Sequence, residues 1–364
     1  MAMARALIAA LLLLMLAACG RGELLGPFAE SRTPPAIGPR FFAPEGWTWG
    51  FVQTGGRPIQ RYGVATTWRA PRATVVILPG YGESAEVWFE TVGALTRRGY
   101  TVWVLDRAGQ GGSARYTLPR DLGYAPSFDP DVATLKGLVK VVIRPQPGTP
   151  LILLGHADGA VVALRAAETG LRVDGVIASS PNLATRAVSQ DTAQAWAGRI
   201  PLLGRLPNAG WRPWSRSQPD ERERGRTHDL WRGALAKAWQ TANPDLRMSE
   251  PSLGWRGAHQ AASRQAQTDA GRIPVPVLVI TAGGADAQTT ALCKALRHCS
   301  PLAIPGARPD LHLESETWRA PWFAAVTAFI ADKVDASRAV AMPRAAANSP
   351  DNSEALEEDR PKDH

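Results

Sequence analysis

Histidine and cysteine are scarce in this sequence of 364 residues, which holds six of the first and three of the second. The histidines are scattered, and neither H-E-x-x-H nor a clustered Cys/His spacing occurs, so we expect no metal site. A phosphate-binding G-x-x-x-x-G-K-[ST] loop is also missing, and we expect no cofactor. Although the net charge is +8, basic residues do not interleave with aromatic ones as in a nucleic-acid module. This excludes a nucleic acid as the expected partner and favours attraction to anionic envelope surfaces.

The most informative absence is that of a serine. Residues 151–162 predict a buried strand, a sharp turn and a helix, which is the context of the G-x-S-x-G nucleophile elbow. Ala157 stands at the central position, between Gly155 and Gly159. A methyl group can neither attack a carbonyl nor carry an acyl intermediate. The pattern therefore predicts a hydrolase architecture without the hydrolase's nucleophile.

The N-terminus has the form of a bacterial lipoprotein signal peptide, expected to span residues 1–18. Arg5 precedes an apolar stretch that is too short to be a stable membrane anchor. Residues 16–20 resemble a lipobox with Cys19 as the acylated first residue of the mature chain; the alternative is an ordinary cleaved signal that contains a cysteine. Gly20 after the cysteine favours the periplasmic face of the outer membrane, with membrane contact through the acylated N-terminus.

Apolar runs alternate with helical patterns through most of the chain, which predicts an α/β fold with a mostly parallel central sheet flanked by helices. The expected strands are 74–78, 101–105, 151–154, 175–178 and 275–280, and the expected helices include 85–98, 130–143 and 160–169. The predicted organisation is a tether at 19–45, a core formed by 46–181 and 272–333, an inserted mainly helical cap at 182–271, and a disordered tail at 334–364.

The cap segment is rich in tryptophan and arginine. Its indoles either face lipid headgroups, since tryptophan favours the wet edge of an apolar layer, or fill a small helical core, and the sequence leaves both open. The residues are Trp196, Trp211, Trp214, Trp231, Trp239 and Trp255, with Arg199, Arg205, Arg212 and Arg216.

Four segments in order carry a resemblance to a known family. They are Pro79–Ser84, Asp106–Ser113, Asn243–Leu246 with Pro251–Trp255, and Ile304–Arg308. Over roughly residues 60–332 the chain resembles the α/β-hydrolase fold, specifically the bacterial lysophospholipase and monoacylglycerol lipase group classified with serine aminopeptidases. The resemblance implies a serine–histidine–acid triad and an oxyanion site formed by the backbone N–H groups of Tyr81 and Asp158.

Two members of the implied triad are replaced. Ala157 occupies the nucleophile position, and Pro309 follows Arg308 where the group has its catalytic histidine. His312 lies three residues further on and is expected to be a semi-exposed polar residue rather than a substitute. Asp286 fits the turn that carries the acid and is the candidate retained member, although the loop after it is shorter than usual in the group.

Other residues near the expected strand ends are weaker candidates for an active site. Asp158 could act as a nucleophile only in a shifted register, with His156 as the remaining histidine in the elbow. Ser179 and Ser180 are explained by a turn into the cap, and Ser84 by a helix cap. Ser113 belongs to the same layer of the fold.

Cys293 and Cys299 are left once Cys19 is acylated, and in an oxidising compartment they form either a disulfide or two buried thiols. On one unbroken helix their Cα atoms would be about 9 Å apart, beyond disulfide reach, so a bridge requires the helix to end near Arg297.

The sequence thus favours a catalytically inactive, lipid-anchored protein that binds an acyl lipid, another small envelope ligand or a protein partner. The alternative is a carboxylic-ester hydrolase of lysophospholipase or monoacylglycerol lipase type with a non-standard active site.

Overall fold

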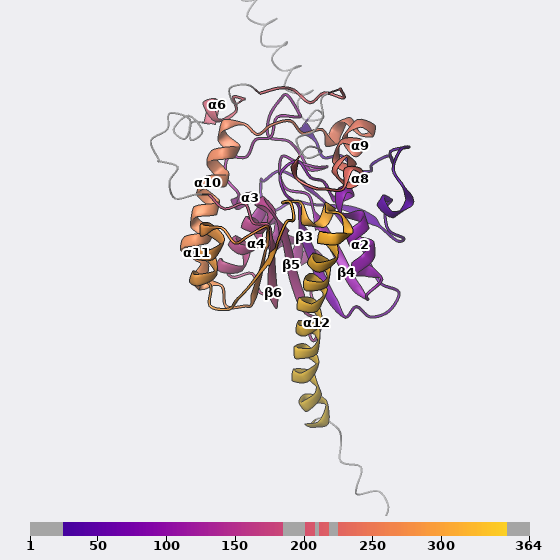
Figure 1. The fold of residues 1–364 in the computed structure, drawn as a ribbon, viewed down its shortest axis with the longest axis vertical. Helices are drawn as coiled ribbons and strands as arrows, with labels where there is room; N and C mark the ends of the chain where they lie inside the picture. Colours follow the sequence, from indigo (N-terminus) through magenta and orange to yellow (C-terminus); the bar gives the residue numbers. More distant parts are fainter. Residues whose placement is uncertain (1–24, 185–200, 208–210, 218–224, 348–364) are drawn as a thin grey trace, which may run out of the picture.

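A single eight-stranded sheet forms the centre of the protein (Figure 1). The computed structural model describes residues 25–184, 201–207, 211–217 and 225–347, so Cys19, Trp196 and Arg199 lie outside the described residues. The strands are β1 (Thr48–Val52), β2 (Gln60–Ala65), β3 (Ala73–Leu78), β4 (Tyr100–Leu105), β5 (Leu151–His156), β6 (Gly175–Ser179), β7 (Val277–Ala282) and β8 (Cys299–Ile304).

The strand order is β1-β2-β4-β3-β5-β6-β7-β8, and only the pairings of β2 are antiparallel. Every residue of β3, β5 and β6 is buried, which explains their continuous apolar runs: a parallel sheet is covered on both faces. The chain moves outward from β3 in one direction to β4 and in the other to β5. Such a switch point places a crevice at the carboxyl ends of β3 and β5.

Helices cover both faces of the sheet. On one face, α3, α4, α10 and α11 pack with a group of buried residues that includes Leu153, Val161 and Val176, here called the first core cluster. On the other face, α2 and α12 pack with the second core cluster, which includes Ile77, Val104 and Trp322. Figure 1 shows the two groups of helices on opposite sides of the sheet. The helices and helical turns are η1 (Pro39–Phe41), η2 (Ala85–Trp88), α2 (Phe89–Thr96), α3 (Asp129–Gly137), η3 (Leu138–Ile143), α4 (Asp158–Glu168), α6 (Pro201–Gly204), α8 (Leu230–Gly233), α9 (Leu235–Ala242), η4 (Pro244–Leu246), α10 (Leu253–Thr268), η5 (Ala270–Arg272), α11 (Ala287–Ala295), η6 (Leu311–Leu313) and α12 (Glu316–Ala347). The predicted α/β architecture is confirmed.

The expectation of a flexible tether at 19–45 is wrong for residues 25–42. Residues 25–42, here called the N-terminal strap, lie against the domain: Phe41 is buried, and Phe28 packs against the second core cluster. Arg32 exchanges two hydrogen bonds with the side chain of Asn243, from its N–H (2.7 Å) and to its carbonyl (2.9 Å). A Pro- and Gly-rich composition predicts a flexible tether, but the apolar side chains spaced along this segment bury surface and fix it to the domain.

The expected start of the disordered tail at 334 is also wrong, because α12 continues to Ala347 (Figure 1). Val334 lies within α12 and is buried in the second core cluster, so the helix still packs on the domain at this point. The alanine-rich sequence beyond Val334 has high helix propensity. No helix among the described residues combines the length and apolarity needed to cross a membrane.

The expected cap is helical in its described parts, with α6, α8, α9 and α10, but its end at 271 differs from the structure. Helix α10 packs against α4 and α11, and Trp255, Ala258 and Ala266 belong to the first core cluster. The core therefore resumes with α10 rather than at 272. A helix that closes a sheet face has the same amphipathic pattern as a cap helix, so composition could not separate them.

Candidate functional site

Ala157 occupies a strained turn between β5 and α4. Its φ of 49° and ψ of −113° are unusual for a residue with a side chain, and this is the conformation by which an elbow raises its central side chain above the sheet. A Cβ at Gly155 would clash with the backbone of Ala160, and one at Gly159 with the carbonyl of Leu78. Glycine is therefore required at both positions. The elbow is complete, and its nucleophile position holds a methyl group.

A cavity of about 970 Å³ opens above the elbow at the carboxyl ends of the strands. Ala157 lines it, and Gly80 approaches so closely that a Cβ there would be 3.2 Å from the Ala157 methyl. The cap side is lined by Arg212, Trp214 and Met248 among others. The cavity thus lies at the switch point of the sheet, where open α/β sheets have their ligand-binding crevice.

The carboxylate of Asp158 occupies the expected oxyanion site. The Tyr81 N–H donates to Asp158 Oδ2 at 3.3 Å, while Asp158 Oδ1 accepts a hydrogen bond from the Asn182 side chain at 2.8 Å and lies 3.1 Å from His259 Nε2. Asp158 is buried. A fixed negative charge at a peptide N–H would repel the negative charge of a tetrahedral intermediate, because like charges interact strongly where water is excluded.

His259 is a site residue that sequence reasoning missed. It lies on α10 one turn after Trp255, and the two rings stack with centroids 5.5 Å apart. The i, i+4 spacing of two aromatic side chains on a predicted helix was an available signal.

Pro309 lines the cavity where a catalytic histidine was implied, and the next residue turns inward. Asp310 is fully buried, 3.2 Å from His156 Nε2, and it accepts three hydrogen bonds of 2.6–3.1 Å from the guanidinium of Arg226. Burial alone would raise the pKa of Asp310, but the His156 hydrogen bond and the Arg226 charge outweigh it and lower that pKa. Arg226 comes from the cap, lines the cavity, and had no sequence signal.

His312 is not the semi-exposed residue expected. It is buried, its ring is stacked on Trp88 with centroids 3.8 Å apart, and its Nε2 lies 3.7 Å from Glu83 Oε1. The short turn η6 directs it under the cavity loop, because Leu311 and Leu313 on either side are core residues. It is therefore directed away from the place of the missing histidine.

Glu83, His156 and His312 have ligand atoms within 4.8 Å of one another, so residues scattered in the sequence form a buried cluster that could hold a metal ion. Glu83 already accepts hydrogen bonds through Oε2 from the Gly80 N–H (2.8 Å) and the Trp88 indole (3.2 Å). The pKa of His156 is lowered by burial but raised more by Glu83 and Asp310. These contacts make the cluster a support beneath the loop that carries Tyr81.

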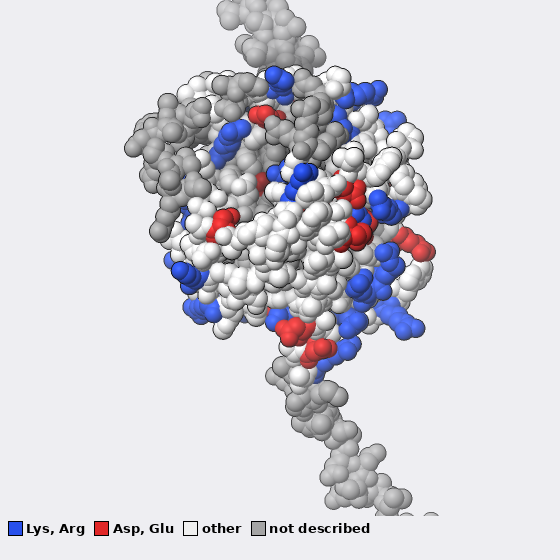
Figure 2. Space-filling model, in the orientation of Figure 1, with Lys and Arg blue, Asp and Glu red and all other residues white. Residues whose placement is uncertain are grey.

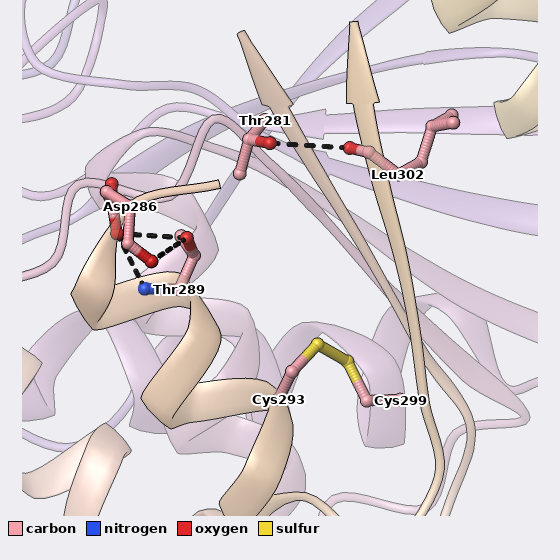
Figure 3. Close-up of a disulfide and its surroundings, with 6 residues drawn as sticks. All are labelled: Thr281, Asp286, Thr289, Cys293, Cys299 and Leu302. Atoms are coloured by element: carbon pink, nitrogen blue, oxygen red, sulfur yellow. Dashed lines mark hydrogen bonds between the residues drawn. A yellow bond between two sulfur atoms is a disulfide. The ribbon is translucent and has the colours of Figure 1, made fainter. Parts of the chain in front are cut away.

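Asp286 lines the cavity but its carboxylate turns toward its own helix (Figure 3). It is exposed, and it accepts hydrogen bonds from the N–H (2.7 Å) and hydroxyl (2.9 Å) of Thr289 as the N-cap of α11.

Two turns later α11 ends at Ala295, and Cys293 and Cys299 are joined in a disulfide with Cα atoms 5.3 Å apart.

The serines near the strand ends have mainly structural contacts. Ser113 Oγ donates to the Asp106 carbonyl (2.8 Å), and Ser179 Oγ accepts from the Trp322 indole (3.0 Å). Ser84 precedes η2, but its side chain makes no capping hydrogen bond. Ser180 lines the cavity with a φ of 42°.

The sheet order, the elbow and the cap over the crevice together define an α/β-hydrolase fold. The family model described as serine aminopeptidase, S33, matches residues 69–300, and the chain belongs to this family.

Solved structures share the fold at low sequence identity. A soluble variant of monoglyceride lipase from Saccharomyces cerevisiae, in complex with a substrate analogue, has a TM-score of 0.63 at 15% identity, covering 83% of this chain and 99% of that chain. Monoacylglycerol lipase from Paleococcus ferrophilus has a TM-score of 0.57 at 21% identity over 75% and 98%. A carboxyl esterase from Bacillus coagulans, in complex with glycerol, has a TM-score of 0.62 at 16% identity over 80% and 99%.

Replacing Arg226 by Gln should make the protein more sensitive to acid. Because the pKa of Asp310 is lower in the folded chain than in the unfolded one, its ionisation stabilises the fold above about pH 4, and that contribution is lost as the pH falls. Without the guanidinium the folded-state pKa rises, so the midpoint of acid unfolding, followed by circular dichroism, moves to higher pH. The exposed Arg216→Gln is the control. Equal midpoints for both variants would contradict this role of the Arg226–Asp310 pair.

Proposed function

We propose that this protein is a lipid-anchored member of the family that binds an acyl-containing ligand of the bacterial envelope and does not hydrolyse it. The observation that carries the proposal is an intact elbow and cavity around a methyl group at Ala157. A protein partner at the same cavity is the other form that such a binding function could take.

Three changes support the loss of hydrolysis, and each removes a different element of the chemistry. Ala157 supplies no nucleophile, Pro309 supplies no proton acceptor, and the Asp158 carboxylate takes the Tyr81 N–H. Asp286, the remaining acid, caps α11 instead of facing a histidine. If only one of these three elements were missing, a single substitution could restore it. With all three changed, acyl transfer lacks its usual nucleophile, its usual proton acceptor and a free oxyanion donor.

The cavity supports a retained binding role. Its volume of about 970 Å³ is in the range of small-molecule sites, and it combines the aromatic side chains of Trp214 and Trp255 with the polar groups of Arg226 and Lys237. The similar solved structures include a monoglyceride lipase, a monoacylglycerol lipase and a carboxyl esterase, which favours an acyl chain as the bound group.

Hydrolysis through a non-standard site remains the second candidate because of one contact. The Asp158 carboxylate lies in the cavity wall and 3.1 Å from His259 Nε2, so an acid–histidine pair is present, though not in the family's positions. Measurable turnover of monoacylglycerols or short-chain p-nitrophenyl esters that disappears in Asp158→Asn would favour this candidate over a binding protein.

A bulky side chain in the cavity should abolish ligand binding. Met248 is buried and lines the cavity, so Met248→Trp adds volume where an acyl chain would lie. We expect acyl lipids in extracts of the purified protein by mass spectrometry, and their loss by tenfold or so in Met248→Trp. The control is Leu230→Trp, which adds the same ring at an exposed position on α8. Equal lipid content in all three proteins would exclude the cavity as the binding site.

Restoring the triad should require removal of the Asp158 charge as well. We expect Ala157→Ser with Pro309→His to remain nearly inert toward p-nitrophenyl esters, and addition of Asp158→Leu to raise kcat/KM by about a hundredfold, the effect of one oxyanion donor. Asp158→Leu alone is the control and should stay inactive. Equal activity of the double and triple variants would show that the carboxylate does not block the oxyanion site.

Acylation at Cys19 is tested by Cys19→Ser. We expect this variant to lose labelled-palmitate incorporation and to leave the membrane fraction or stall in processing, because stable anchoring requires the attached chains. Unchanged fractionation and labelling would mean that the protein is secreted without a lipid anchor.

A further inference from the structure

The chain becomes fixed to the domain within a few residues of the proposed anchor. The Leu25 carbonyl accepts a hydrogen bond from the Arg115 N–H at 2.8 Å, and the Gly26 carbonyl accepts one from the Arg120 side chain at 3.0 Å. Five residues, 20–24, separate Cys19 from Leu25. Even fully extended they span about 20 Å, so an acylated Cys19 holds this side of the domain close to the bilayer.

Exposed leucines lie on the loop that contacts the strap and on the α6 segment that is held against that loop. Leu118, Leu203 and Leu206, here called the leucine face, are 42%, 37% and 49% exposed. Leu118 is two residues from Arg120. The Leu253 N–H donates to the Leu206 carbonyl (3.3 Å), and the adjacent Ser252 N–H donates to the Gly123 carbonyl (2.8 Å), so the end of α6 is held next to the loop that contacts the strap.

Among the described residues, the charges around the leucine face are mainly positive, and Arg205, Arg212 and Arg216 are exposed. Two described acids nearby have partners: Asp245 pairs with Arg120 at 3.2 Å, and Glu250 lies 3.7 Å from Arg256. Figure 2 shows basic side chains spread over this upper end of the molecule. Leucines interspersed with arginines suit an anionic lipid surface, where apolar side chains enter the interface and guanidinium groups meet phosphates.

The cavity borders the same face. The loop that carries Leu118 continues to Asp121, which accepts hydrogen bonds from the N–H groups of Trp214 (2.7 Å) and Ser249 (2.8 Å), both of which line the cavity. Arg212 also lines it. The leucine face therefore adjoins segments that line one side of the cavity.

We infer that the leucine face docks on an anionic bilayer and presents the cavity entrance to the lipid. The short reach from Cys19 rests on the proposed anchorage, but the docking of the face does not. Of the two alternatives left open for the cap tryptophans, burial holds for Trp239 and Trp255, and the indoles of Trp211 and Trp214 donate to Ser249 and Gln240. Trp231, on α8, is 73% exposed and is not part of the leucine face.

The test uses the chain from Gly20 onward, which holds every described element and lacks Cys19, so that acylation plays no part. Because Cys293 and Cys299 are bonded to each other, a cysteine introduced at Leu206 or at the exposed Asp335 on α12 is the single reactive thiol. With an environment-sensitive fluorophore attached, vesicles of phosphatidylcholine and phosphatidylglycerol should shift the emission of the Leu206→Cys label to the blue and leave that of the Asp335→Cys label unchanged.

A second measurement uses vesicle sedimentation of the same chain. We expect the Leu203→Asp, Leu206→Asp double variant to bind phosphatidylglycerol-containing vesicles about tenfold or more weakly, because two apolar side chains no longer enter the interface. Leu230→Asp, at an exposed leucine outside the face, should bind like the unchanged chain. Failure of the unchanged chain to bind these vesicles, equal binding of all variants, or a shift confined to the Asp335→Cys label would overturn the inference. If Cys19→Ser leaves membrane fractionation and labelling unchanged, only the proposed lipid anchor is contradicted. The vesicle experiments test the docking of the leucine face independently, because they use a chain without Cys19.

Discussion

The close approach of α4 to the ends of β3 and β5 determines where every group of the site lies. It depends on the lack of side chains at Gly155 and Gly159 and on the positive φ of Ala157 between them. This strained geometry places the Ala157 methyl beside the Gly80 loop and directs the first residue of α4, Asp158, toward the Tyr81 N–H. The backbone thus keeps a costly conformation although a methyl group stands at the centre of the elbow. This conformation shapes one wall of the cavity.

Charges that have no counterpart in the implied triad now occupy its surroundings. Asp158 pairs with Asn182 and His259, while Asp310 joins His156 in the core to Arg226 from the cap. Each buried carboxylate has several donors, as burial of a charge requires. The Asp310–Arg226 pair thus connects core and cap directly beside the cavity. A ligand entering between them would meet carboxylates that already have protein partners, beside aromatic and cationic side chains such as Trp214 and Lys237.

The sequence was sufficient for β3 to β7 and for the elbow, because continuous apolar runs and the glycine spacing indicate buried strands and a tight turn. It was insufficient for β1, β2 and β8, which lie toward the edges of the sheet; β8 is largely exposed and carries no apolar pattern. The positions of Ala157 and Pro309 followed from order along the chain. The partners of Asp158 and Asp310 did not, since Arg226 and His259 are brought in by folding over long separations. Burial of His312 depends on a single short turn, and such a turn changes a side chain's direction without changing the local composition.

The N-terminal strap has a consequence for the order in which the chain can fold. Arg32 has its partner in Asn243, 211 residues later, so the contacts of the strap cannot be completed until most of the chain has been synthesised. Contacts of such sequence separation form late, because the entropy of closing the loop must be met before they stabilise anything. The strap is therefore among the last segments to be fixed, and during that interval its apolar residues Phe28 and Phe41 remain exposed.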